Sequence, residues 1–514
     1  MSIISFYFLC FLALVIILYY TVPLFCKKRG QWFVLLAASI AYYLLAGNGQ
    51  LIIFPIISSV VTWGLLKLLA KTNEEELVKR RLILAAELVI LLGILIAFKY
   101  NKFVGTGTQS PAGLSYYTFI LLGYFVEVYN GIGKERGNVL QTTLYGIYFP
   151  LMTNGPIIKT REHGEQFFGY HPLNYENITF GAQRILWGFF KKLVISARLA
   201  TIVNTIYNND TQYPGAYIWL GTVCFAFQLY TDFSGAMDIV IGLSRMLGIV
   251  LPENFTTPFL AKNISEYWRR WHITLGVWMK DNVFYPLLRT KMITELGKKM
   301  KKAFGKKKGK QITTYVAMFI LWLSVGLWHG GELKFVIGSG LLHWAYIVIG
   351  EVTLPFFTWL FAEKMHINMQ SKFADGVRVV RTFFLVCIGD LFFRADNVPH
   401  ALRMLKESVS VFNPQIFFNG KILDLGLNIY EWGVLIISLA ILITVSAIQY
   451  RMELVRDGKI TGSRFEGNSN IREYIASGKP VVRWMIYIAL FFFVLLLAQY
   501  GPGFSTADFI YREF

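Results

Sequence analysis

The sequence predicts an all-α polytopic membrane protein with about 10–12 transmembrane helices. Two observations predict this fold class. Of the 514 residues, 55% are hydrophobic and only 16% are charged, whereas roughly a quarter of the residues are charged in soluble domains. In addition, apolar runs of about 20 residues, the length that crosses the hydrocarbon core of a bilayer, recur along the chain.

The basic residues lie mostly between the apolar runs. The formal net charge is +19, from 50 Lys and Arg against 31 Asp and Glu. Cytoplasmic loops of membrane proteins accumulate Lys and Arg in this way, so the charge does not predict nucleic-acid binding. The four cysteines show no CxxC spacing, which predicts neither a disulfide framework nor a zinc site; they are Cys10, Cys26, Cys224 and Cys387.

The first 25 residues are apolar and form the first predicted span. The cations of residues 27–29 follow this stretch, whereas a cleavable signal peptide carries its basic residues in front. We therefore expect a retained helix with its N-terminus outside the cytoplasmic membrane. Residues 71–81 then form a cytoplasmic turn. The N-terminal helices, residues 1–135, contain predicted spans at 3–25, 32–48, 51–70, 82–99 and 112–130.

The central region, residues 136–395, begins with short apolar segments that are broken by Gly, Pro and polar residues. The stretch from Asn154 to Ile157 is too polar to face lipid. Irregular backbone at membrane depth is tolerated where it is buried in protein or lines a wet cavity. This pattern predicts re-entrant or broken helices around a cavity. One clear span is predicted at 214–231, and residues 239–250 continue the apolar pattern.

Residues 264–288 predict an amphipathic helix at the membrane interface. Their apolar residues recur mostly at three- and four-residue spacings, which is typical of such helices; they are Trp268, Trp271, Leu275, Trp278 and Phe284. A cytoplasmic loop, residues 291–310, follows. It has eight lysines between Lys298 and Lys310. These lysines indicate a loop that fixes topology and contacts anionic headgroups, with a dedicated substrate or nucleic-acid surface as the alternative.

Further spans are predicted at 312–330, 334–362 and 376–394. The C-terminal helices, residues 396–514, contain spans at 430–450 and 481–500. Basic residues between these two spans place that loop inside the cell and the C-terminus outside.

Two histidines lie in otherwise membrane-like sequence. His272 stands in Tyr267-Trp-Arg-Arg-Trp-His-Ile-Thr-Leu, and His329 stands in Ser324-Val-Gly-Leu-Trp-His-Gly-Gly. An ionisable group in apolar surroundings is a candidate functional site. A neutral imidazole near pH 7 can take a proton from a hydroxyl, so His329 suits a general base for acyl transfer. A packed histidine bonded to a carbonyl is the structural alternative.

A second histidine could orient an acceptor or stabilise a developing oxyanion, and His272 is the candidate for this role. His343 is a third candidate, for which a structural role is an equal alternative. No metal site is predicted, because HExxH-like spacing is lacking and Glu332 is the one carboxylate within a turn of His329.

Several motifs, in their order along the chain, resemble those of the membrane-bound O-acyltransferases, with most similarity to the alginate O-acetyltransferase branch. Four central ones are Tyr230-Thr-Asp-Phe-Ser-Gly, Leu251-Pro-Glu-Asn-Phe, the His272 motif and Leu327-Trp-His-Gly. Further similar stretches are 113–119, 154–157, 188–192, 392–396 and the tail 508–511. Two features depart from the family pattern: residues 291–310 look like an insertion, and Gly331-Glu-Leu-Lys334 replaces a more apolar sequence.

The resemblance implies a funnel-shaped core of membrane helices, with residues 136–395 as its catalytic part. It implies acyl transfer to a hydroxyl, with His329 as the invariant histidine and His272 as the second catalytic position. No permanently bound cofactor is implied, and acetyl-CoA is the acyl donor. We expect Arg269, Arg270, Lys191 and Lys192 to meet the phosphates of the donor. We expect the substrate channel to include Trp328, Asn154, Tyr230, Asp232, Ser234 and His343.

The implied acceptor is an extracytoplasmic polysaccharide, reached directly or through an outer partner transferase of the SGNH type. One rival is D-alanyl transfer from a carrier protein toward teichoic acid, as in a sister branch. Another is a non-enzymatic polysaccharide export subunit, which the broken middle helices and the aromatic content favour. The lack of visible half-repeats argues against a transporter.

Overall fold

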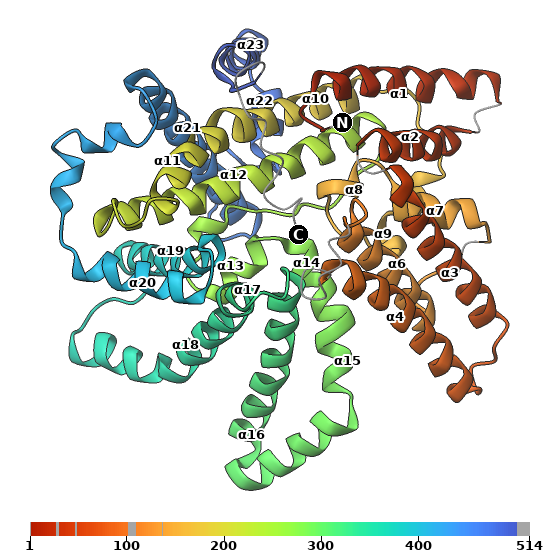
Figure 1. The fold of residues 1–514 in the computed structure, drawn as a ribbon, viewed down its shortest axis with the longest axis horizontal. Coiled ribbons are helices and arrows are strands. Elements are labelled where there is room, and N and C mark those ends of the chain that lie inside the picture. Colours follow the sequence, from red (N-terminus) through yellow and green to blue (C-terminus); the bar gives the residue numbers. More distant parts are fainter. Residues whose placement is uncertain (1, 27–29, 47–48, 101–108, 136, 501–514) are drawn as a thin grey trace. The chain divides into compact units, whose positions relative to one another are not determined.

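The computed structural model describes residues 2–26, 30–46, 49–100, 109–135 and 137–500. The regular secondary structure of these residues is helical throughout (Figure 1). Their internal contacts divide them into two compact units. Unit 1 comprises the described residues of 1–189 and 233–253, and unit 2 comprises residues 190–232 and 254–500. The predicted tail motif 508–511, the C-terminus and the cations 27–29 lie outside the described residues.

Seven helical segments of the described chain are long and apolar enough to cross a membrane, which confirms the predicted class of an all-α polytopic membrane protein. Two shorter apolar helices, Gln31–Leu45 and Leu114–Tyr129, coincide with further predicted spans. The spans predicted at 214–231 and 376–394 lie largely within long helices that are outside this set of seven. The seven segments are Phe6–Phe25, Gly49–Ala70, Leu77–Lys99, Lys291–Trp328, Leu333–Lys364, Ile429–Arg456 and Pro480–Leu497.

Unit 1 contains the N-terminal helices and the second half of α12 (Ala216–Met246). Its other helices are α1 (Phe6–Phe25), α2 (Gln31–Ala46), α3 (Ile53–Ala70), α4 (Leu77–Lys99), α6 (Leu114–Tyr129), α7 (Val139–Ile147), α8 (Leu151–Asn154), α9 (Thr160–His163) and α10 (Tyr175–Phe189), with 3₁₀ turns η1 (Gly49–Ile52) and η2 (Gly164–Phe167). The short helices α7 to α9 agree with the predicted broken middle region.

Polar side chains inside unit 1 are paired across helices. Thr62 on α3 donates a hydrogen bond of 2.7 Å to the buried carboxyl of Glu87 on α4. On α10, Arg184 donates to Asp238 on α12 at 2.9 Å and binds both carboxylate oxygens of Glu253. Charges that are buried in a low-dielectric interior need such partners, so these pairs specify which helix faces meet.

Unit 2 begins with the π-helix η3 (Phe190–Ser196), α11 (Ala197–Tyr207) and the first half of α12. Its middle part contains η4 (Pro258–Leu260), α13 (Ile264–Arg270), α14 (Ile273–Met279), η5 (Lys280–Phe284), α15 (Tyr285–Leu288), α16 (Lys291–Trp328), α17 (Leu333–Phe335), η6 (Val336–Leu341), α18 (Leu342–Thr358) and η7 (Trp359–Lys364). Its last part contains α19 (Lys372–Arg394), α20 (Val398–Ser410), η8 (Pro414–Phe417), η9 (Lys421–Asp424), α21 (Ile429–Arg456), α22 (Ile471–Ala476) and α23 (Pro480–Leu497).

The helix α16 and the π-helical turn η6 touch through their backbones. A Cβ atom built on Gly326 would lie 2.7 Å from the Cα of Val336, and one built on Gly340 would lie 2.7 Å from the carbonyl oxygen of Trp322. Small residues allow this approach, as they do in other membrane helix pairs. The contact fixes the end of α16, where Trp328 and His329 lie.

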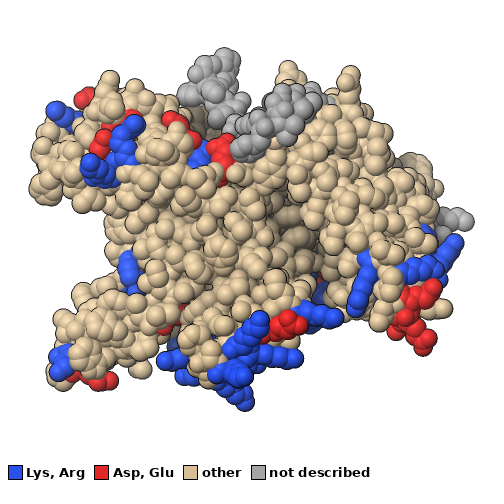
Figure 2. All heavy atoms as spheres, turned by 60° about the horizontal axis from the view of Figure 1, so that its bottom comes forward, with Lys and Arg blue, Asp and Glu red and all other residues tan. Residues whose placement is uncertain are grey.

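The lysine-rich stretch differs from the predicted loop, because residues 291–310 lie in α16. We call them the lysine-rich arm. The helix bends at Gly305, whose φ of 79° is left-handed, and Figure 1 shows this bend. All eight lysines are exposed, and Figure 2 shows Lys and Arg side chains gathered at the lower edge of the view. Lys, Met and Ala are good helix formers, so helix propensity overrides the loop-like charge run.

Candidate active site

His329 follows the last residue of α16 and is the C-terminal capping residue of this helix. Two glycines with positive φ follow it: 134° at Gly330 and 75° at Gly331. Glycine adopts such conformations without a side-chain clash, so the chain can turn sharply into α17. The residue is 3% exposed. His329 therefore lies buried in unit 2, at the C-terminal end of a helix.

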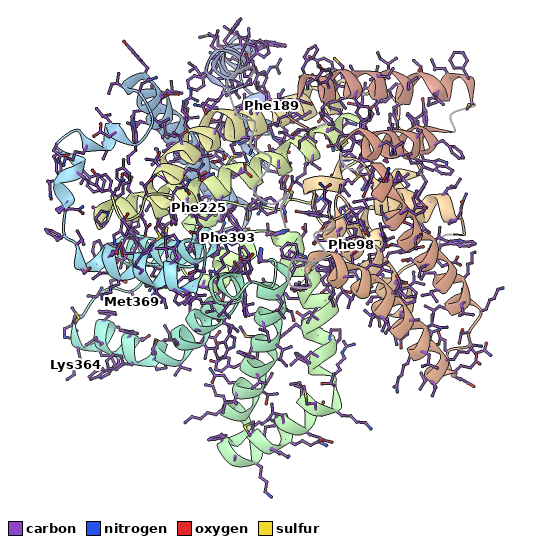
Figure 3. All side chains as sticks on the ribbon, viewed as in Figure 1. Phe98, Phe189, Phe225, Lys364, Met369 and Phe393 are labelled. Carbon is purple, nitrogen blue, oxygen red and sulfur yellow. The ribbon has the colours of Figure 1, made fainter. Side chains whose placement is uncertain are left out.

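Aromatic rings surround His329. Its ring centroid lies 5.7 Å from that of Phe393 on α19, at an interplanar angle of 82°. Phe393 also contacts Phe335 at 4.9 Å and Phe225 at 6.2 Å; Figure 3 labels Phe225 and Phe393. Edge-to-face contacts of this kind orient rings in a packed interior. A ring of α19 therefore packs on His329, and Phe225 of α12 and Phe335 of α17 pack on that ring.

His272 lies at a break between α13 and α14, not on one continuous interfacial helix over 264–288 as the pattern predicted. Its backbone is left-handed, with φ 44° and ψ 52°. This conformation costs an L-residue roughly 1–2 kcal/mol and is kept where surrounding bonds impose it. Two such bonds flank the residue: Thr256 N–H donates to Arg270 O at 2.9 Å, and Ile273 N–H donates to Asn254 O at 3.0 Å.

The indole of Trp328 contacts both histidine rings. Its ring centroid lies 6.0 Å from that of His272 and 4.7 Å from that of His329. The two histidines are 57 positions apart in the sequence (329 minus 272), yet both belong to unit 2. The structure therefore brings the two candidate catalytic residues to the same neighbour.

Asn254 anchors the His272 side of the site. Its side-chain oxygen Oδ1 accepts hydrogen bonds from Thr274 N–H at 3.0 Å and from Thr274 Oγ1 at 2.9 Å. Oδ1 also lies 3.2 Å from Nδ1 of His272. Asn254 is 1% exposed, and it satisfies N–H groups in the first turn of α14 that have no partner within the helix.

Burial also controls the protonation of His272, which lies outside the seven candidate spans. Desolvation lowers the pKa of His272 to about 3, because burial disfavours the charged imidazolium. The ring is therefore neutral at physiological pH. A neutral imidazole has one N–H donor and one nitrogen lone pair.

The four cations predicted to meet donor phosphates have different surroundings. Lys192 is buried and forms an ion pair with Asp232. Lys191 is also buried, and its Nζ lies 5.8 Å from the ring centre of Tyr230. Arg270 donates to Glu453 at 2.6 Å and to Glu266 at 3.0 Å. Arg269 is exposed.

The residues predicted for the substrate channel divide between the two units. Unit 2 contains Trp328, Tyr230, Asp232 and His343, whereas unit 1 contains Asn154 and Ser234. All six are buried. His343 packs against two indoles, with ring centroids 5.0 Å from Trp268 and 5.8 Å from Trp322. Tyr230 lies 6.2 Å from Trp271, the residue before His272.

Two residues of the site were not assigned a role from the sequence. Asn254 was visible as a polar residue in the Leu-Pro-Glu-Asn-Phe motif, but its partners lie 18 and 20 positions away in a loop pairing that has no periodic signal. Phe393 was visible in the Phe392-Phe-Arg-Ala-Asp motif. Its contact with His329 joins segments 64 positions apart (393 minus 329).

The sequence is similar to one protein family and to several known proteins. Residues 133–375 match the model of the membrane-bound O-acyltransferase family. A probable alginate O-acetylase from Pseudomonas fluorescens is 30% identical over 378 residues, which cover 73% of this chain and 70% of that protein. The corresponding protein from Pseudomonas aeruginosa is 30% identical, over 62% of this chain and 55% of its own length.

A peptidoglycan O-acetyltransferase from Helicobacter pylori is 28% identical, over 65% of each chain. The chain thus spans between about half and 70% of the length of the curated relatives it matches. The matched region of the family model includes both His272 and His329. This multi-pass membrane protein belongs to the membrane-bound O-acyltransferase family.

Proposed function

We propose that this protein is an O-acyltransferase that moves an acetyl group from acetyl-CoA to a hydroxyl of an extracytoplasmic polysaccharide. The single observation that carries the proposal is the placement of two buried histidines, His272 and His329, against one indole in unit 2. The printed names of the relatives, O-acetylases of alginate and of peptidoglycan, support acetyl as the group and a glycan as the acceptor.

In the proposed reaction, His329 is the general base. It takes the proton of the acceptor hydroxyl while the hydroxyl oxygen attacks the thioester carbonyl. A carbon–oxygen bond forms, the carbon–sulfur bond breaks, and the proton passes to the leaving thiolate of CoA. His272 assists at the same centre. General base catalysis of this kind contributes roughly 10²–10⁴-fold to the rate.

The proposed setting is the cytoplasmic membrane, with the N-terminus and the C-terminus outside. Acetyl-CoA would approach from the cytoplasm and the hydroxyl from the other side, so that CoA itself need not cross. The hydroxyl belongs to the polysaccharide or to a serine of an SGNH-type partner transferase that passes the acetyl group on.

Transfer from radiolabelled acetyl-CoA by the purified full-length protein, with cell-surface glycan as acceptor, tests the proposal. We expect His329→Ala to lower transfer by at least about 100-fold, with unchanged protein yield and elution. His366→Asn is the control, because His366 is exposed and asparagine tolerates its left-handed backbone, with φ 50°. Wild-type transfer by His329→Ala would reject His329 as the base.

The same preparation separates the rival functions. Transfer that requires an aminoacylated carrier protein and ignores acetyl-CoA would identify a D-alanyltransferase. Cells in which His329→Ala blocks polymer export, with the acetyl content of exported polymer unchanged, would identify an export subunit. We expect the opposite: export continues and the polymer lacks acetyl esters.

A further inference from the structure

The backbone N–H of Thr274 fixes the orientation of the Asn254 side-chain amide, because this group can only donate a hydrogen bond. A backbone N–H is always a hydrogen-bond donor. Because Thr274 N–H lies 3.0 Å from the outer atom of the Asn254 amide, that atom must be the oxygen and not the nitrogen. The usual uncertainty between the two orientations of an asparagine amide is therefore removed at this position.

The orientation of Asn254 decides which nitrogen of His272 carries the proton. An amide oxygen only accepts hydrogen bonds, so the Nδ1 atom 3.2 Å from it must be the donor. The imidazole is neutral because it is buried, as described above. Its lone pair is therefore on Nε2, the nitrogen on the other side of the ring.

We propose that Asn254 is a positioning residue that holds His272 as the Nδ1–H tautomer, so that His272 presents an unprotonated Nε2 to the acceptor glycan. The single proton of the reacting hydroxyl goes to His329, and Nε2 of His272 accepts a hydrogen bond from a second hydroxyl of the glycan. This inference rests on the proposed function, in which His272 assists transfer, and it specifies that role. A lone pair cannot donate to an oxyanion. His272 therefore orients the acceptor glycan toward attack and does not stabilise the tetrahedral intermediate.

The local geometry supports a dedicated role for this contact. The backbone oxygen of Asn254 accepts from Ile273 N–H at 3.0 Å, and its side-chain oxygen accepts from Thr274. The same residue thus binds the backbone on the C-terminal side of His272 and the imidazole itself. This double attachment limits both the position of the His272 backbone and the rotation of its ring.

The direct test is ¹⁵N NMR of the full-length wild-type protein labelled at its histidines, of which there are 7. The His272 signals are assigned by their loss in His272→Asn. At pH 7 we expect a protonated Nδ1 and an unprotonated Nε2. A ring protonated at Nε2, or at both nitrogens, would overturn the inference, whatever the variants do.

Variants at position 254 connect the tautomer to turnover. Asn254→Asp keeps an acceptor oxygen, so we expect the Nδ1–H tautomer and kcat within about tenfold of wild type. Asn254→Ala removes the acceptor, so we expect a mixture of the two tautomers of His272. The kcat should fall by about 100-fold or more, as it does when a catalytic histidine is held in the wrong tautomer. The KM for acetyl-CoA should be unchanged. An equal fall of kcat in Asn254→Asp, with the tautomer retained, would overturn the inference.

Thr274→Val is the matched control for stability. It removes the 2.9 Å bond from Thr274 Oγ1 to Asn254 but leaves the contact with His272, so we expect wild-type tautomer and turnover. Failure of the proposed function gives a different result. The wild-type protein would then transfer no acetyl from acetyl-CoA, or His272→Asn would transfer it at the wild-type rate, although the wild-type tautomer is as expected. The two failures are therefore distinguishable.

Discussion

Arg269 and Arg270 are neighbours in the sequence with different surroundings. Arg270 forms ion pairs with Glu266 and Glu453. Its guanidinium also lies over the ring of Tyr450. Arg269 is exposed. Of this pair, Arg269 is therefore the side chain that we propose to meet a phosphate of the acyl donor.

We expect Arg269→Ala to raise the KM for acetyl-CoA by about 3–10-fold, because loss of one exposed contact of about 1 kcal/mol changes affinity by a factor of this size. The kcat should be unchanged, since the contact is equal in the ground state and the transition state. Lys299→Ala, in the lysine-rich arm, is the control for a lost surface charge. Equal KM values in Arg269→Ala and wild type would remove Arg269 from the donor site.

The residue types of the site were predictable, and their connections were not. An apolar context singled out His272 and His329, and the tryptophan next to each was visible. The shared contact with Trp328, however, depends on how α16 meets the α13–α14 break in three dimensions. The role of Asn254 depends on a loop pairing that has neither a period nor a charge pattern.

At the scale of elements, the backbone contact between α16 and η6 supports the position of His329. We expect Gly340→Ala to lower the melting temperature and to reduce transfer, because the new methyl would lie 2.7 Å from the carbonyl oxygen of Trp322. Overpacking of this kind costs about 1–3 kcal/mol. Thermal unfolding of the detergent-solubilised protein measures the effect.

Gly350→Ala on the adjoining helix α18 is the control for this prediction. Apart from the adjacent residues and the backbone of its own helix, no described atom would lie within 4 Å of a Cβ there. Alanine also favours a helix by about 1 kcal/mol over glycine. We expect an unchanged or slightly higher melting temperature. If both variants behaved alike, the contact between α16 and η6 would not be what stabilises this end of the helix.

Hydropathy predicted most of the elements, and periodicity failed at one position. The spacing of Trp268, Trp271, Leu275 and Trp278 is helical across the whole stretch, so nothing in it reveals the break at His272. The backbone bonds to residues 254–256 impose that break from outside the helix. The lysine-rich arm shows the reverse error, because its charge suggested a loop where its residues favour a helix.

For the whole molecule, the distribution of charge predicts the orientation in the membrane. After replacement of the exposed Cys10 and Cys26 by serine, we expect a cysteine introduced at Lys302, in the lysine-rich arm, to react only with cytoplasmic maleimide. A cysteine introduced at Asn419 should react only from outside. Both positions are exposed.

Labelling of whole cells and of inverted vesicles with a membrane-impermeant reagent makes the measurement. The two positions should give opposite patterns. Reaction of both from the same side, or of Lys302→Cys from outside, would contradict the predicted topology and the proposed route of acetyl-CoA. Composition and the recurring apolar runs predicted the membrane class, but the division into two compact units within α12 had no counterpart in the sequence.

The left-handed backbone at His272 affects how the residue should be probed. Alanine scanning would exchange the imidazole for a methyl group in a conformation that alanine rarely adopts, so lost folding and lost chemistry would be measured together. Asparagine tolerates this conformation better than most residues. A library restricted to asparagine and glycine at this position would therefore report on the imidazole with the smallest background from misfolding.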